Sequence, residues 1–210
     1  MEDDKGPNDR SGNLSSESSY SDIPDGVASE STVVLHVCKK LSSLRDKIIL
    51  DAAGSPVYFA ECHRSSANIQ LHTGGDKKNP VVAELSPGHT HKYELNFGQQ
   101  KHSMEQSSRH RSDLSWTVPG HPSSFQWVSA HRGNSQLVEE DSGKVVAAFV
   151  ANRRVPGERG MGKFVIDGEY CEKYGLEFER GVVLGGLVLL GLHSRAVAGA
   201  GSAAASAIVI

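Results

Sequence analysis

The sequence predicts a mainly β protein, a closed antiparallel β-barrel of about twelve strands around a central hydrophobic helix near the C-terminus. From Val33 onward, short segments rich in Val, Ile, Tyr, Phe and Trp alternate with turn clusters that contain Gly and Pro. These segments follow one another without the helical crossovers that a parallel sheet requires. One late stretch, residues 181–192, is apolar on all sides, which is typical of a helix that is buried on all sides. A barrel filled by a helix satisfies these three observations together.

Composition and charge divide the chain into three parts. Residues 1–31 form an acidic, Ser-rich leader, residues 32–195 the predicted barrel, and residues 196–210 a tail rich in Ala, Gly and Ser. Residues 1–30 carry eight acids against two bases, whereas the whole chain has a formal net charge of −3, so the remainder is mildly basic. The leader has too few apolar residues to offset its ordering entropy, and we expect it to be disordered.

The strands are separated by turn signals, among them Pro87-Gly88 and Asp167-Gly168. Two turns share one design, an Asp followed within three residues by a Gly, at Asp51 and Asp141, and each predicts a hairpin in which the Asp bonds the turn backbone. The segment Gln99–Arg111 has almost no apolar content and predicts a long solvated loop. The expected strands are Val33–Val37, Lys47–Asp51, Val57–Cys62, Asn68–His72, Val81–Leu85, His91–Phe97, Asp113–Val118, Ser124–Ala130, Gln136–Glu140, Lys144–Ala151, Gly162–Ile166 and Glu172–Phe178.

The expected helix covers Val182–Leu192. Its length of about 16 Å matches the height of a strand of five or six residues. Glycines at 181, 185, 186 and 191 each cost about 1 kcal/mol of helix propensity relative to Ala, and we expect them to allow close approach of barrel side chains. The side chains expected to form the core of the helix are Val183, Leu184, Leu187, Val188 and Leu190.

This combination resembles the tubby C-terminal-like superfamily, which includes the LURP-one-related and phospholipid scramblase proteins. The likeness covers residues 33–195 and depends on the architecture together with three phrases, at 50–54 (LDAAG), 140–143 (EDSG) and 178–184 (FERGVVL). It is closest in character to small, uncharacterised fungal members of that group. The resemblance implies a barrel wrapped around a hydrophobic C-terminal helix. It also implies that lipid headgroups are a class of ligand to consider, bound by basic residues on the barrel surface.

The candidate binding residues lie in and beside a Gly- and Pro-containing loop between two expected strands: Arg153, Arg154, Arg159 and Lys163. Guanidinium groups offer paired donors to phosphate, so this loop is the expected contact for an anionic headgroup. The alternative interpretation is a solvated hairpin tip. The spacing from Gly157 to Lys163 imitates a P-loop, but Phe164 stands where a Ser or Thr must hold Mg²⁺, and we expect no nucleotide hydrolysis.

The sequence offers no catalytic site. Cys62 and His63 are neighbours, so on a strand their side chains point to opposite faces and cannot form a nucleophile–base pair. The histidines, including His89 and His91, lack spaced Cys or carboxylate partners, and no dense acidic run predicts a calcium loop. We therefore expect no metal, no cofactor and no enzymatic activity. Three scattered cysteines and the lack of a signal peptide favour a reducing, intracellular setting.

The function expected from these observations is that of a non-enzymatic intracellular binding or scaffold module, cytoplasmic and peripheral at membranes, which contacts anionic phospholipid or a protein partner and binds no nucleic acid. Two alternatives stay open. One is a tail-anchored membrane protein that inserts Val182–Ile210, although Arg195 would lie near the middle of that segment. The other is a carrier or enzyme whose barrel encloses a cavity for a small molecule. The ligand and the oligomeric state are not indicated.

Overall fold

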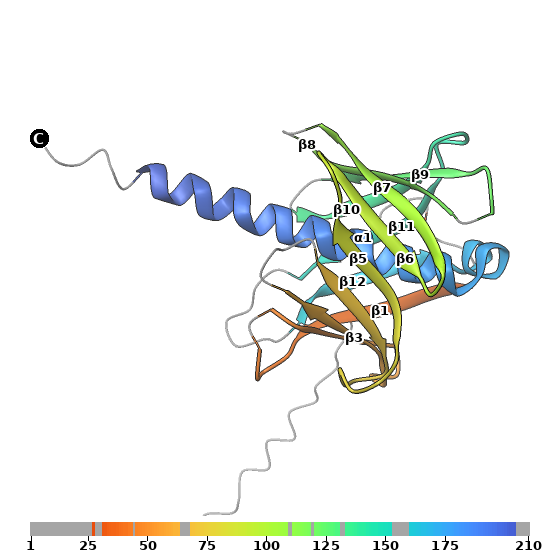
Figure 1. Ribbon diagram of the computed structural model, residues 1–210, viewed down its shortest axis with the longest axis horizontal. Coiled ribbons are helices and arrows are strands. Elements are labelled where there is room, and N and C mark those ends of the chain that lie inside the picture. The colour runs from red at the N-terminus through yellow and green to blue at the C-terminus, as the bar shows by residue number, and fades with distance from the viewer. Residues whose placement is uncertain are drawn as a thin grey trace, which may run out of the picture.

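The computed structural model describes residues 27, 31–43, 45–63, 68–108, 111–118, 120–130, 133–152 and 160–204. Within this part, twelve strands form a closed barrel in which each strand pairs antiparallel with its neighbours in sequence, and the first strand closes against the last (Figure 1). The predicted fold class is confirmed. The strands are β1 (Thr32–Lys39), β2 (Lys47–Leu50), β3 (Pro56–Cys62), β4 (Ile69–Thr73), β5 (Val81–Pro87), β6 (Lys92–Phe97), β7 (Gln100–Ser108), β8 (Arg111–Thr117), β9 (Ser124–Ser129), β10 (Ser135–Glu139), β11 (Val145–Ala151) and β12 (Gly160–Asp167), followed by α1 (Gly168–Ala204).

The single helix, α1, gives the barrel two distinct ends. It begins directly after β12 and passes through the barrel, and its second half continues beyond the opposite end (Figure 1). We use the term entry rim for the end of the barrel at which α1 begins. The odd-numbered strands start at this rim and the even-numbered strands end there. The end where α1 leaves is the exit rim. Because the strands alternate in direction, every connection between consecutive strands lies at one rim or the other.

The helix supplies the centre of the core. Val183, Leu184, Leu187 and Val188 are at most 5% exposed, and Leu190 packs partly buried against the same cluster. The inward residues of the strands surround them, so the residues expected to form the helical core do lie in the interior. Trp116, Trp127 and Phe164 are among the large side chains that contact the same cluster.

The helical glycines are needed for this packing. A Cβ on Gly185 would lie 2.7 Å from Trp127 Nε1, and a Cβ on Gly181 would lie 2.7 Å from Trp116 Cζ3. Real Cβ contacts are not that short, so each glycine allows an aromatic ring to rest directly on the helix backbone. This confirms the close approach that the sequence led us to expect at these two positions.

The polar segment Gln99–Arg111, predicted to be a loop, contains β7 and the first residue of β8, and that prediction was wrong. β7 pairs with β6 through Tyr93 opposite Met104, and with β8 through Met104 opposite Trp116. Met104 is fully buried, while several outward residues of the strand are exposed. In a closed barrel, backbone hydrogen bonds to both neighbouring strands can hold a segment in the strand conformation even where its side chains do not predict a strand.

The segment Glu172–Phe178, predicted to be a strand, is helical, which is a second correction. Tyr170, Tyr174 and Phe178 are spaced by four residues, the period of a helix, and all are buried at the entry rim. Gly175 interrupts the regular geometry with φ of 73° and ψ of −166°. The helix also runs further than its predicted end at Leu192, because it continues through residue 204 into the expected tail.

The residue Asp167 fixes where α1 begins. The sequence predicts a turn at Asp167-Gly168, but Asp167 Oδ1 accepts a hydrogen bond from the backbone amide of Glu169 at 3.0 Å, which is an N-cap. Its second oxygen forms an ion pair with Lys144 Nζ at 3.0 Å, and the carboxylate is 1% exposed. The cap and the ion pair together hold the helix over the mouth of the barrel.

The two predicted Asp–Gly hairpins turn out differently. In the first, Asp51 Oδ1 accepts from Ser55 N at 2.8 Å and Gly54 adopts a φ of 82°, as predicted. In the second, Ser142 makes the side-chain bonds of the turn: its hydroxyl accepts from Lys144 N at 3.2 Å and donates to a carboxylate oxygen of Glu139 at 2.6 Å. The expected leader, 1–31, falls outside the described residues except for Val27 and Ser31.

Candidate functional site: the basic exit rim

The predicted binding residues divide between described and undescribed parts of the chain. Arg153, Arg154 and Arg159 lie outside the described residues. Lys163 lies on β12, opposite His36 of β1 and Val150 of β11, and is partly buried. The segment 153–159 connects β11 to β12, and both of its flanking residues, Asn152 and Gly160, lie at the exit rim, where Asn152 N donates to Met161 O at 3.1 Å.

A second basic segment lies at the same rim, in the hairpin that joins β1 to β2. We call residues Lys39–Lys47 the basic hairpin: four of the nine are Lys or Arg, and the single acid is Asp46. Its turn is closed by hydrogen bonds from Ser43 N to Lys40 O at 3.2 Å and from Lys40 N to Asp46 O at 3.1 Å. The backbone therefore presents the cations from a defined turn.

The charges of the basic hairpin are arranged on both sides of the barrel wall. Lys40 Nζ lies 4.4 Å from the centre of the Phe59 ring, a cation–π contact on the outer face of β3. Lys39 and Lys47 are paired across β1 and β2, each two residues beyond a buried core residue on the same face. By the period of a strand, these two side chains point toward the mouth of the barrel where α1 leaves.

Burial and local partners set the chemistry of this rim. Burial lowers the pKa of Lys47, with Cys62 and Asp46 acting in the opposite direction. The ammonium group of Lys47 also donates a hydrogen bond to the carbonyl oxygen of Arg45. Asp46 is occupied structurally, because its Oδ1 accepts from Cys62 N at 3.1 Å. The acid of the hairpin is thus engaged with the backbone, whereas Lys39 and Arg45 are exposed.

One large apolar side chain is exposed among these cations. Leu41, at the tip of the basic hairpin, is 76% exposed, the highest exposure of any large hydrophobic side chain in the described residues. Lys39 and Lys40 precede it directly in the chain. Leu41 thus places a strongly exposed apolar side chain beside the cations of the basic hairpin.

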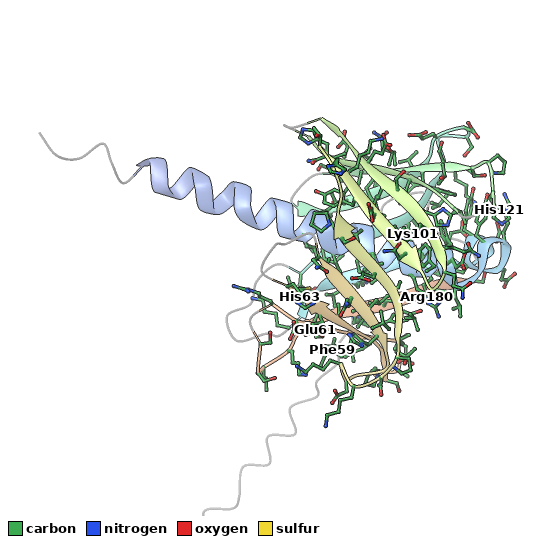
Figure 2. The ribbon with its side chains drawn as sticks, viewed as in Figure 1. Phe59, Glu61, His63, Lys101, His121 and Arg180 are labelled. Atoms are coloured by element: carbon green, nitrogen blue, oxygen red, sulfur yellow. The ribbon has the colours of Figure 1, made fainter. Side chains whose placement is uncertain are left out.

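The entry rim has the opposite charge character. Its segments Glu139–Lys144 and Asp167–Arg180 contain eight acids and three bases. Glu139 illustrates how these acids are held: its carboxylate accepts hydrogen bonds from Ser142 and from the hydroxyl of Tyr170 at 2.9 Å, and the Ser142 bond is the main reason that its pKa is lowered. Figure 2 shows the two ends of the barrel: Phe59 and Glu61 lie on β3, His63 follows β3 on the side of the exit rim, and His121 lies on the side of the entry rim.

Other groups considered from the sequence do not form a reactive site. Cys62 packs partly buried against the core and His63 is exposed, as expected for neighbours on a strand. Burial raises the pKa of Cys62 to about 11, which disfavours the thiolate. Among the described residues, no group of three or more His, Cys, Asp or Glu side chains has the geometry to hold a metal ion.

The position of α1 bears on the two alternatives from the sequence, a membrane anchor and a barrel that encloses a small molecule. Residues 181–189 of α1 are all buried within the barrel, so its centre is filled by protein side chains. Of the described residues, no helical segment combines the length and the hydropathy needed to cross a bilayer.

Sequence reasoning missed the basic hairpin, although its signal is visible. The run Lys39-Lys40 followed by Arg45 and Lys47 lies between two expected strands, just as Arg153–Lys163 does. What the sequence did not provide was the rim at which each connection lies, and that depends on strand order and on the direction of α1.

Comparisons with known proteins give one distant structural likeness. No family model matches the sequence, and no curated protein matches it. Among solved structures, the chain is similar to the X-ray structure of the Arabidopsis thaliana protein AT5G01750, with 11% sequence identity and a TM-score of 0.45 over 68% of this chain and 86% of that one.

Proposed function

We propose that this protein is a non-enzymatic binding module that contacts anionic phospholipid headgroups with its exit rim. The observation that carries the proposal is the grouping of exposed cations and an exposed leucine at the end where the apolar helix leaves the barrel. Arg153, Arg154, Arg159 and Lys163 belong to this proposal, because the connection between β11 and β12 begins and ends at the same rim.

The electrostatic contribution follows from the number of exposed cations. Each Lys or Arg near an anionic bilayer surface contributes about 1 kcal/mol of attraction, which falls off within a Debye length of about 8–10 Å. Lys39 and Arg45 together therefore contribute about 2 kcal/mol, or roughly thirtyfold in affinity. The acidic entry rim would be repelled by the same surface, so the charge distribution favours one orientation with α1 pointing toward the bilayer.

The architecture supports a second part of the proposal, membership of the tubby C-terminal-like superfamily. The closed antiparallel barrel around a buried C-terminal helix is the arrangement that the resemblance implies. The phrase at 178–184 lies where α1 enters the core, and the phrase at 50–54 forms the turn after β2. Within this proposal, the basic hairpin is the particular surface that meets the headgroups.

Vesicle co-sedimentation tests the proposal. The full chain is mixed with neutral phosphatidylcholine vesicles and with vesicles that contain an anionic phospholipid, at low and at high salt. We expect binding only to the anionic vesicles, and loss of that binding as salt rises. The double variant Lys39→Gln with Arg45→Gln should lose roughly thirtyfold in affinity.

A matched control removes charge from the opposite rim. Lys77 and Lys78 are exposed in the turn between β4 and β5, so Lys77→Gln with Lys78→Gln lowers the net charge at the entry rim. This variant should bind anionic vesicles as the unaltered chain does. Equal loss in both variants would show that net charge alone governs binding, and the assignment of the exit rim would be wrong. Equal binding to neutral and anionic vesicles would overturn the lipid proposal itself.

A further inference from the structure

The described part of the N-terminal segment is fastened to the outside of the barrel. Val27 is fully buried and packs in a cluster with Ala148, Val150 and Val165, the outward residues of β11 and β12. Four residues later, Ser31 O accepts a hydrogen bond from Gly168 N at 2.6 Å at the entry rim. Val27 therefore lies on the outer wall of β11 and β12, and Ser31 lies at the entry rim just before β1.

The contacts of Val27 fix the place on the barrel from which the preceding segment starts. Ala148 lies opposite Val165, and Lys163, two residues closer to the exit rim, lies opposite Val150. Val27 contacts this middle part of the wall, whereas Ser31 lies at the entry rim. The segment on the N-terminal side of Val27 is thus tethered at the middle of the wall, between the two rims.

The distances involved are short. From Val165 to Gly160 the strand rises about 17 Å, and β2 lies two strand spacings, about 10 Å, from β12. A chain of 26 residues spans up to about 86 Å when fully extended. The segment before Val27 therefore has ample length to reach the basic hairpin.

The charge of that segment is opposite to that of the rim. Residues 1–26 contain seven acids and two bases, and Asp22 and Asp25 lie within five residues of Val27. Five serines stand at 15, 16, 18, 19 and 21, beside Glu17 and Asp22. A phosphate on one of them would add about −1.5 to −2 charges.

We propose that the acidic segment 1–26 docks on the basic hairpin at the exit rim and competes there with anionic lipid. The competition rests on the proposed function, whereas the docking contact does not. A tethered acidic segment acts at a high effective concentration, so a weak contact is sufficient to occupy the rim when no lipid is present. Phosphorylation of the serines strengthens the contact and lowers the affinity for lipid.

The docking contact is tested without lipid by zero-length carbodiimide cross-linking of the full chain, followed by mass spectrometry. This reagent joins carboxylates to lysines only where they touch. We expect cross-links from leader carboxylates to Lys39 and Lys40. Lys173 is the internal control, because it is exposed on α1 near the entry rim, where Ser31 is anchored. Cross-links that favour Lys173, or that are spread evenly over all lysines, would overturn the docking proposal.

The competition is tested with the full-length variant Glu17→Gln, Asp22→Asn and Asp25→Asn, which keeps the chain length and the Val27 anchor. Its affinity for anionic vesicles should rise by about threefold or more at low salt, and the gain should disappear at high salt. Unchanged affinity together with normal vesicle binding by the unaltered chain would refute the competition alone. Cross-links to Lys39 and Lys40 without any vesicle binding would support the docking and refute the lipid function.

Discussion

The substitution Gly186→Ala separates packing from helix propensity inside the barrel. A Cβ on Gly186 would lie 2.7 Å from Phe164 Cζ and closer still to Cε1. Carbon atoms in good contact are about 3.5–4.0 Å apart, so the ring would have to move by about 1 Å. Phe164 is fully buried, and its ring centre lies 5.1 Å from that of Phe149 and 6.4 Å from that of Trp127. Any displacement of the ring must therefore be passed to its neighbours.

Two opposing contributions decide the outcome. Replacing a helical Gly by Ala gains about 1 kcal/mol of helix propensity. Overpacking a close-packed core costs about 1–3 kcal/mol, and the upper value applies where the new atom meets a buried ring. The free energy of unfolding should therefore fall by about 2 kcal/mol, which corresponds to a decrease in Tm of about 4–8 °C for a domain of this size.

Urea unfolding followed by tryptophan fluorescence measures the effect, because Trp116 and Trp127 are both buried and report on the same core. The control is Gly191→Ala, at a half-buried position where α1 leaves the barrel, and it should be neutral or slightly stabilising. Adding Phe164→Leu to Gly186→Ala should recover at least about 1 kcal/mol of coupling energy. Strict additivity of the two substitutions, or a Gly186→Ala variant as stable as the unaltered protein, would show that α1 does not pack against Phe164.

Three further predictions concern thiols, capping and pH. Burial raises the pKa of Cys62 to about 11 and that of Cys171 to about 12. Both thiols should therefore react slowly with iodoacetamide at pH 8 in the folded protein and rapidly in urea, as measured by mass spectrometry. Equal reaction rates in the two conditions would contradict their burial. Asp167→Ala should lower the free energy of unfolding by about 1–3 kcal/mol, because it removes the helix cap and the ion pair. Asp167→Asn should lower it by less, since Asn can also cap a helix. A larger loss for the Asn variant than for the Ala variant would count against the cap. Glu139 has a lowered pKa in the folded state, so its contribution to stability is present at neutral pH and is lost as the pH falls through that value. Chemical denaturation should show that Glu139→Gln costs stability at pH 7 but little at acid pH, whereas a cost independent of pH would point to packing.

The central helix was predictable because its sequence leaves one physical solution. Residues 182–190 are apolar on all sides, and only full enclosure removes that surface from water. The strand series around it was predictable for the same reason, since alternating Val, Ile and aromatic residues require one buried face. The structure places these two sets of residues in a single core cluster.

The two secondary-structure errors have different physical causes. β7 has little apolar content of its own, and it is a strand because β6 and β8 bond to it on both sides. The segment Glu172–Phe178 contains β-favouring aromatic residues, but Asp167 caps a helix immediately before it. Tyr170 and Tyr174 lie on one helical face before the interruption at Gly175, and Phe178 after it packs its ring against both. The four-residue spacing of these aromatics was the available signal.

For the candidate site, the sequence indicates basic residues but not how they are grouped. Basic residues beside Gly and Pro indicated an anion-binding loop at 153–163, but the basic hairpin becomes its neighbour only when β12 closes on β1. That closure joins residues more than a hundred positions apart in the sequence. The point at which the acidic leader is attached to the barrel likewise depends on the burial of Val27, a single valine whose cluster partners are all far along the chain.

The position of α1 also determines what kind of membrane contact is physically accessible. To serve as an anchor, the helix would have to leave the barrel and take with it the side chains that fill the core: Val182, Val183, Leu184, Leu187, Val188 and Leu189. In a bilayer these side chains would again be out of water, but the inward strand residues of the same cluster, among them Trp116, Trp127 and Phe164, would lose the helix that covers them. At about 1.5–3 kcal/mol for each side chain left exposed, these three alone cost roughly 5–9 kcal/mol, a large part of the stability of an ordinary domain. The barrel would unfold before it released its helix. Attachment through the exit rim requires no such loss, because Lys39, Arg45 and Leu41 are already at the surface, and it is therefore expected to be reversible and sensitive to salt.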